Sequence, residues 1–232
     1  MTHSLRALSN FFKSKKFYSA IALVAVVSLT GAPVSSIAAT KVTAASTLSK
    51  LKVHTEASMS GYARKLFSDG WGSIGSCDTR NYILQRDLKN ITWKSGASCE
   101  VATGVLHDPY TGKVINFVRG VGTSIKVQID HVVPIANAWR MGAQSWNSYK
   151  RYSFYNDPLN LLAVDGPTNE AKSDSDASQW LPPRVSYRCA YVARQIAVKY
   201  RYGVWVTRAE KSAMASVLHA CPGYPLPKTI IY

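Results

Sequence analysis

The stretch Q-I-D-H-V-V-P, Gln128 to Pro134, decides how the rest of the sequence is interpreted. It follows apolar residues at positions 125, 127 and 129, an alternation that is typical of a strand with one buried face. We expect the strand to end at Asp130, so that an acid and a histidine stand side by side there. Both groups can bind a metal ion, and neither stabilises a buried strand. The pair therefore indicates a functional site.

The N-terminus has the three parts of a secretory signal peptide. Lysines at 13, 15 and 16 precede an uncharged apolar run over residues 17–29, and small residues follow through Ala39. We predict that residues 1–39 are removed, with cleavage after Ala38 or Ala39. The alternative is an uncleaved membrane anchor, but the apolar run is short for a span of about 20 residues. No cysteine stands directly after the run, where a lipid anchor would be attached.

The chain is strongly basic, with 28 Lys and Arg against 13 Asp and Glu in 232 residues, a formal charge of +15. Loss of residues 1–39 removes four basic residues and no acids, which leaves a net charge of +11. An exported protein of this charge is expected to meet a polyanion: nucleic acid, an anionic cell wall or acidic lipid. A role of the charge in solubility alone is the competing explanation.

The four cysteines lie at positions 77, 99, 189 and 221, all beyond the predicted cleavage site. An even number in an exported chain indicates disulfides, and four cysteines allow three pairings. None of them has the C-x-x-C spacing of a zinc site. We favour the pairs Cys77–Cys99 and Cys189–Cys221.

The chain is expected to hold one folded domain over residues 61–222. A Ser/Thr/Ala-rich flexible leader over 40–60 precedes it, and a tail over 223–232 follows. Helices are predicted over 80–88, 135–143, 146–155 and 166–171, and strands over 91–93, 100–106, 114–118 and 127–130. A turn is predicted at D-P-Y-T-G, residues 108–112. The fold class is therefore α+β, with small antiparallel strands.

The C-terminal part predicts a helical hairpin. Ser186 is expected to cap a helix that Gly203 stops, and Thr207-x-x-Glu210 is a capping box for a second helix ending near residue 220. An antiparallel pair would bring Cys189, early in the first helix, close to Cys221 after the second. That proximity is the physical reason for the predicted pairing.

Three later residues accompany Asp130-His131 in a fixed order. Asn160 stands ahead of a short apolar run, and Asn169 and Lys172 share one face of a predicted helix. Asp130-His131-x-x-Pro134, Asn160-Leu161 and Asn169-x-x-Lys172 together resemble the HNH (ββα-metal) endonucleases. The similarity is greatest to secreted proteins related to the C-terminal domain of the GmrSD restriction enzymes, and wider motifs extend it over most of residues 61–221.

The resemblance implies a ββα-metal core and a metal-dependent phosphodiesterase. His131 would act as the general base, and Asp130 and Asn169 would bind one Mg²⁺ or Mn²⁺. Asn160 would hold the loop that orients the histidine. Lys172 would contact the phosphate, with a solvated charge as the equal alternative. The simpler interpretations are helix capping for Asp130 and a structural role for Asn169 and Asn160.

The substrate expected from this resemblance is DNA, with RNA as a second candidate, cut with little sequence specificity. Arg119 is a further candidate phosphate ligand. A basic surface could contact further phosphates; its residues are Lys150, Arg151, Arg184, Arg188, Arg194, Lys199 and Arg201. We expect a secreted protein, free or attached to the cell wall, without stable membrane association. The alternative function is a non-catalytic binder of extracellular DNA or cell-wall polyanions, and a competition toxin would use the same chemistry.

Overall fold

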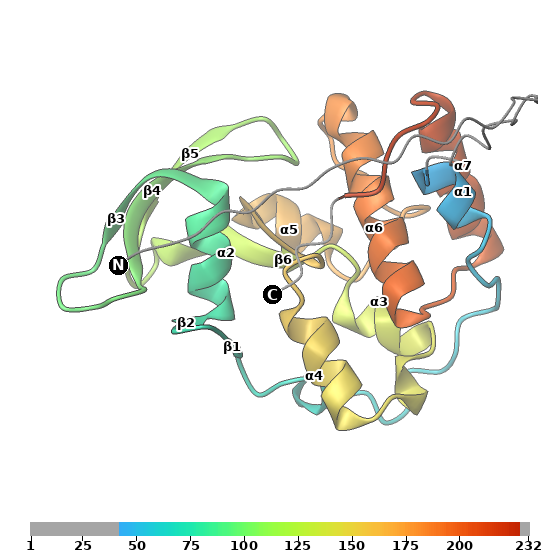
Figure 1. Cartoon of the computed structure of the whole chain (residues 1–232), viewed down its shortest axis with the longest axis horizontal. Helices are drawn as coiled ribbons and strands as arrows, with labels where there is room; N and C mark the ends of the chain where they lie inside the picture. Colours follow the sequence, from blue (N-terminus) through green and yellow to red (C-terminus); the bar gives the residue numbers. More distant parts are fainter. Residues whose placement is uncertain (1–41, 228–232) are drawn as a thin grey trace, which may run out of the picture. The chain divides into compact units, whose positions relative to one another are not determined.

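The computed structural model describes residues 42–227, and the predicted signal peptide lies outside them. Within this range the chain forms α-helices, short 3-10 helices and seven strands. The strands make three small antiparallel sheets, β1–β2, β3–β4–β5 and β6–β7 (Figure 1). The predicted α+β class is confirmed at this level.

The three-stranded sheet follows helix α2 (Thr79–Asp87). Its strands are β3 (Leu88–Trp93), β4 (Val101–His107) and β5 (Val114–Val118). Asp78 caps α2 by accepting a hydrogen bond from the Asn81 amide at 2.7 Å. The predicted turn joins β4 to β5, and Gly112 supplies the φ of +82° that it needs. Two short strands precede α2, β1 (Ser73–Ile74) and β2 (Cys77–Asp78).

The sheet that carries Asp130 and His131 is built from β6 (Val127–His131) and β7 (Leu161–Asp165). In this antiparallel pair Asp130 lies opposite Leu162 and His131 opposite Leu161. Helix α5 (Gly166–Lys172) follows β7 directly. The chain between β6 and β7 forms α3 (Ile135–Arg140), the 3-10 turn η3 (Ala143–Ser145) and α4 (Ser148–Asn156). Another 3-10 turn, η2 (Ser124–Lys126), leads into β6.

Side chains around Asp130 and His131 reach three separate hydrophobic cores. Val127 and Ile129 belong to a core shared with the three-stranded sheet. Val132 belongs to the core of the C-terminal helices, and Val133 to a third core around α3 and α4. These four apolar residues are at most 7% exposed. Burial in close-packed cores on several sides fixes the backbone that carries the acid and the histidine.

The C-terminal helices are α6 (Arg188–Tyr202) and α7 (Arg208–His219). Gly203 ends α6 with a φ of +70°, and Thr207 caps α7 by accepting from the Glu210 amide at 3.0 Å. The predicted cap at Ser186 is wrong. That residue lies in a 3-10 turn, η4 (Val185–Tyr187), and α6 starts without a side-chain cap.

Both predicted disulfides are present. Cys189 is joined to Cys221 with a Cα–Cα distance of 6.5 Å, which links the start of α6 to the residue just after α7. Cys77 is joined to Cys99 at a Cα–Cα distance of 5.4 Å. The second bridge ties β2 to the segment just before β4.

The segment 40–60 differs from the predicted flexible leader. Helix α1 (Ala44–Leu48) contacts α6 and α7, and Leu48 and Leu51 are each 5% exposed within their core (Figure 1). The Ala44 amide donates to the Tyr224 carbonyl at 2.8 Å, so part of the predicted tail packs here too. The folded domain therefore begins before residue 61. A 3-10 turn, η1 (Arg64–Leu66), lies between α1 and β1.

Candidate active site

Asp130, His131 and Asn169 line one cavity of about 360 Å³ where β6 meets the C-terminal part of α5. The two predicted metal ligands and the predicted general base therefore lie together. Asn160, predicted to hold the loop after the histidine, does not line the cavity. The remaining lining residues are Tyr62, Arg64, Gln128, Ile129, Pro134, Ala136, Glu170, Ser173 and Asp174.

His131 is held in place by a hydrogen bond at one ring nitrogen and by contacts of its ring with two aromatic side chains. Its Nε2 lies 2.8 Å from the Tyr155 carbonyl oxygen. Because a carbonyl can only accept, Nε2 carries the proton and Nδ1 is left as an acceptor. The ring stacks on Trp71 with centroids 5.7 Å apart and planes 10° apart, and it contacts the Tyr155 ring at 4.6 Å.

The surroundings of His131 keep the imidazole neutral. Burial is the main cause that lowers its pKa, to about 3, and the nearby Arg64 and Lys172 charges act in the same direction. The hydrogen bond to Tyr155 opposes them but does not offset them. At neutral pH the imidazole is therefore uncharged and has a fixed tautomer.

Both carboxylate oxygens of Asp130 accept hydrogen bonds from buried groups. Lys172 Nζ lies 2.8 Å from Oδ1, and Tyr110 Oη lies 2.5 Å from Oδ2. Lys172 also donates to the His131 carbonyl at 3.0 Å. Its side chain is fully buried and does not line the cavity. In this structure the ammonium group holds Asp130 rather than standing where a phosphate could meet it.

Asn160 lies under the loop that follows His131. Its Oδ1 accepts from the Val133 amide at 2.8 Å, and its Nδ2 donates to the Val133 carbonyl at 3.2 Å. The Asn160 carbonyl also accepts from the Val132 amide at 2.8 Å. The residue is fully buried, so these contacts satisfy backbone groups that water does not reach. It fixes the backbone directly after the histidine.

Asn169 and Asp130 have the donor chemistry that a hard cation prefers, one amide oxygen and one carboxylate. Asn169 Nδ2 donates to Gln128 Oε1 at 2.8 Å, which leaves Asn169 Oδ1 for another partner. A carboxylate has about four lone-pair sites, so Asp130 keeps capacity beyond its two bonds. No cluster of three or more His, Cys, Asp or Glu suited to a metal occurs within residues 42–227. The set fits a cation such as Mg²⁺, which binds through one or two carboxylates and keeps several waters.

Arg119 does not reach this cavity. Its Nε donates to the Val101 carbonyl at 2.6 Å, and its guanidinium also contacts the Asn81 side chain. It joins β4 to α2, and the predicted phosphate contact is not supported.

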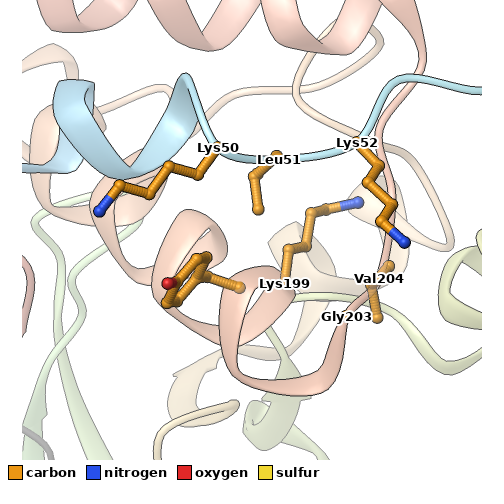
Figure 2. A pocket seen from close by; sticks show the side chains of 7 residues that line it. Lys50, Leu51, Lys52, Lys199, Gly203 and Val204 are labelled. Atoms are coloured by element: carbon orange, nitrogen blue, oxygen red, sulfur yellow. The ribbon is translucent and has the colours of Figure 1, made fainter.

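Most of the basic residues considered for a phosphate surface also serve the fold. Lys199 is buried and pairs with Glu210 at 2.9 Å. It lines a separate pocket of about 210 Å³ with Lys50 and Lys52 (Figure 2). Arg201 pairs with Asp157 at 2.8 Å. Arg151, Arg188 and Arg194 donate to backbone carbonyls.

The sequence does not identify four residues that contact the site: Tyr110, Trp71, Arg64 and Tyr155. Tyr110 belongs to the D-P-Y-T-G stretch, which predicts a turn and is one of the wider family motifs, but neither feature predicts a contact with Asp130. Trp71 and Arg64 lie 60 and 67 residues before His131 in the sequence. No local sequence pattern predicts these contacts, because tertiary packing brings the residues to the site.

No helix within residues 42–227 has the length and apolar character needed to cross a membrane. The chain matches the family described as GmrSD restriction endonucleases, C-terminal domain, over residues 78–217. It is also 40% identical over 181 residues to an uncharacterized secreted protein of Arthroderma benhamiae. The aligned residues cover 77% of this chain and 85% of that relative. The matched range includes Asp130, His131, Asn160 and Asn169. As the motif resemblance predicted, the chain belongs to the family of the GmrSD restriction endonuclease C-terminal domain.

Proposed function

We propose that the protein is a secreted, metal-dependent endonuclease of the HNH type that hydrolyses phosphodiester bonds of DNA. The observation that carries the proposal is the His131 imidazole, neutral and held in one tautomer by the Tyr155 carbonyl, beside Asp130 and Asn169 on one cavity. The order β6, β7, α5 supports a ββα-metal core. Membership in a family of restriction endonuclease domains supports nuclease chemistry.

His131 would take a proton from the attacking water through Nδ1. The contacts of Nε2 with Tyr155 and of the ring with Trp71 would hold that nitrogen in place as the water approaches. Asn160 would keep the following loop in register, so that the histidine does not turn away. Orientation of this kind supplies part of the rate enhancement before any charge develops.

Asp130 and Asn169 would hold Mg²⁺ or Mn²⁺. When bound, the cation would supply charge neutralisation on the phosphate and on the departing oxygen. Lys172 and Tyr110 would fix the orientation of the Asp130 carboxylate from behind. Lys172 would therefore act as a positioning residue rather than as a phosphate ligand.

The predicted signal peptide and the secreted relative support an extracellular location. The basic excess supports a polyanionic substrate. No base-reading module such as a zinc finger or a homeodomain is evident in the sequence, so we propose cleavage with little sequence specificity. DNA is the first candidate, and RNA is the second.

The experiment is cleavage of plasmid and single-stranded DNA by the purified protein with Mg²⁺, with Mn²⁺ or with EDTA. A His131→Ala variant is the test, and folding is checked by its thermal unfolding. Metal-dependent cutting that disappears in the variant would support the reaction class and the base together. DNA binding without cutting under any metal would contradict the enzyme and leave the non-catalytic binding protein.

A further inference from the structure

The chain segment over residues 52–67, which we call the N-terminal strap, lies before the part that matches the family. Several backbone bonds fasten it to the domain. The His54 amide donates to the Val206 carbonyl at 3.1 Å, and the Ala57 amide donates to the Arg140 carbonyl at 2.9 Å. Gln144 Nε2 donates to the Ser58 carbonyl at 2.6 Å. The strap is therefore a fixed part of the structure.

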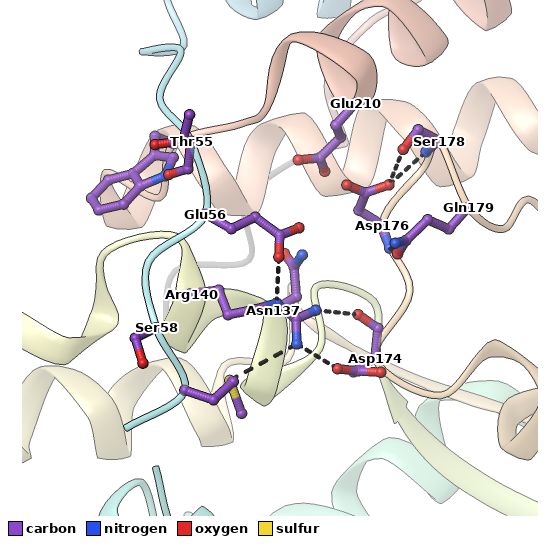
Figure 3. Close-up of polar contacts among 12 residues, drawn as sticks. Thr55, Glu56, Ser58, Asn137, Arg140, Asp174, Asp176, Ser178, Gln179 and Glu210 are labelled. Carbon is purple, nitrogen blue, oxygen red and sulfur yellow. Dashed lines mark hydrogen bonds and ion pairs between the residues drawn. The ribbon is translucent and has the colours of Figure 1, made fainter. Parts of the chain in front are cut away.

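Arg140 links the strap to the candidate active site. Its Nε lies 3.2 Å from Glu56 Oε2 in the strap, and its Nη1 lies 2.6 Å from Asp174 Oδ2, which lines the cavity (Figure 3). Figure 3 shows the guanidinium between these two acids. At the other end of the strap Phe67 is 2% exposed in the core around α3 and α4. The strap is thus anchored on both sides of residues 62–64.

Arg64 stands on this strap at the wall of the cavity. Its guanidinium carbon lies 5.2 Å from the centre of the Tyr155 ring, and Nη2 lies 3.5 Å from the Tyr155 hydroxyl. Tyr155 is the same residue whose carbonyl holds His131. Stacking on an aromatic face leaves the edge N–H groups of a guanidinium available to planar or tetrahedral anions.

The charge of Arg64 has no acidic partner within the described part of the chain. The arginines that do pair there, such as Arg140 and Arg201, each have a carboxylate within 4 Å. Of the described residues that line the cavity, Arg64 is the one lysine or arginine. The cavity carboxylates already have donors: Asp130 has Lys172, Asp174 has Arg140, and Glu170 accepts from the Gln128 side-chain amide at 2.8 Å. An anion that enters the cavity would therefore meet Arg64 as an uncommitted cation.

We propose that Arg64 binds a phosphate group of the nucleic acid at the cavity, so that the N-terminal strap completes a substrate site whose other residues come from the family domain. The inference rests on the proposed function for the identity of the ligand. Arginine suits the role because its fork of donors matches two phosphate oxygens at once.

The test is binding of a labelled DNA oligonucleotide, single-stranded and duplex, in EDTA so that cutting does not interfere. Arg64→Gln is compared with Lys65→Gln, which removes the same charge from the exposed neighbouring residue outside the cavity. Arg64→Lys keeps the charge without the fork. Thermal unfolding checks that all variants fold.

We expect Arg64→Gln to weaken binding about tenfold and to reduce the slope of log K against log salt by about one. Lys65→Gln should stay within about twofold of the unchanged protein, and Arg64→Lys should lie between them. An Arg64→Gln affinity that matches Lys65→Gln would overturn the inference, as would a protein that binds no DNA.

The inference and the proposed function fail in different ways. A protein that binds DNA through Arg64 but never cuts it would contradict the endonuclease and keep the phosphate site. A protein that cuts DNA, with the same binding constant and the same KM in Arg64→Gln, would keep the endonuclease and contradict the phosphate site.

Discussion

The Lys172 ammonium lies 2.8 Å from Asp130 Oδ1, and neither side chain is more than 5% exposed. Lys172 stands at the end of α5, and Asp130 stands near the end of β6, so the pair connects the two elements that line the cavity. A buried ion pair of this kind is costly to break from one side, because the remaining charge cannot reach water.

Replacing Lys172 by methionine should therefore destabilise the protein by about 3–5 kcal/mol, since Asp130 would stay buried without its counter-charge. Urea unfolding with the disulfides intact measures the free energy of unfolding. The double variant Asp130→Asn with Lys172→Met should recover part of the loss, because it removes both charges. A loss below about 1 kcal/mol in the single variant would show that the pair is not formed in solution.

Tyr110→Phe should cost about 1.5–3 kcal/mol, because it removes a hydrogen bond to a charged and buried acceptor. The ring would keep its contacts with Trp180 and Tyr191. Tyr191→Phe is the matched control, since the Tyr191 hydroxyl accepts from the neutral Gln195 amide at 2.9 Å and is equally buried. That change should cost only about 0.5–1.5 kcal/mol. Equal losses in thermal or urea unfolding would argue against a charge-assisted bond to Asp130.

The strands and the helices were predictable where one short pattern determines them. The alternation before Asp130 places β6, the capping residue Thr207 places the start of α7, and Gly203 places the end of α6. The segment around α1 was not predictable in this way. It is rich in Ser, Thr and Ala, yet Ala44, Leu48 and Leu51 are buried in one core with helices far along the chain.

The candidate site divides along the same line. The motif consists of Asp130, His131, Asn160 and Asn169 in a fixed order, so these residues could be identified from the sequence. Their partners come from outside the motif and are chosen by packing, as with Tyr110 behind Asp130. Lys172 shows the limit of the motif itself. Its spacing from Asn169 predicts a shared helical face, but only the fold reveals that this residue points into the interior.

Acid should destabilise the protein through His131. The pKa of His131 is about 3 in the folded protein, against 6.5 for a free histidine. Between these two values the histidine binds a proton in the unfolded chain but not in the folded chain. The contribution is fully present above pH 6.5 and is lost as pH falls toward the folded pKa. Between about pH 7 and about pH 5 the expected loss is roughly 2 kcal/mol.

Urea unfolding at several pH values, compared between the protein and a His131→Gln variant, isolates this effect. Glutamine can still donate to the Tyr155 carbonyl but does not titrate. The variant should lose less stability than the unchanged protein over the same pH range. Parallel pH profiles would mean that His131 is hydrated and protonates freely in the folded state.

Reduction should destabilise the fold through both bridges, because each closes a loop in the unfolded chain. The sequence separations are 22 residues for Cys77–Cys99 and 32 for Cys189–Cys221. Loop-closure entropy for loops of this length corresponds to about 3–4 kcal/mol each.

Replacing each pair of cysteines by serine and measuring thermal unfolding tests the two bridges separately. The loss of Cys189–Cys221 should free the helical hairpin and, with it, the Tyr224 contact to α1. The loss of Cys77–Cys99 should act instead on the junction of α2 and β4. Unchanged melting temperatures after full reduction, with thiol titration showing four free cysteines, would contradict a stabilising role for either bridge.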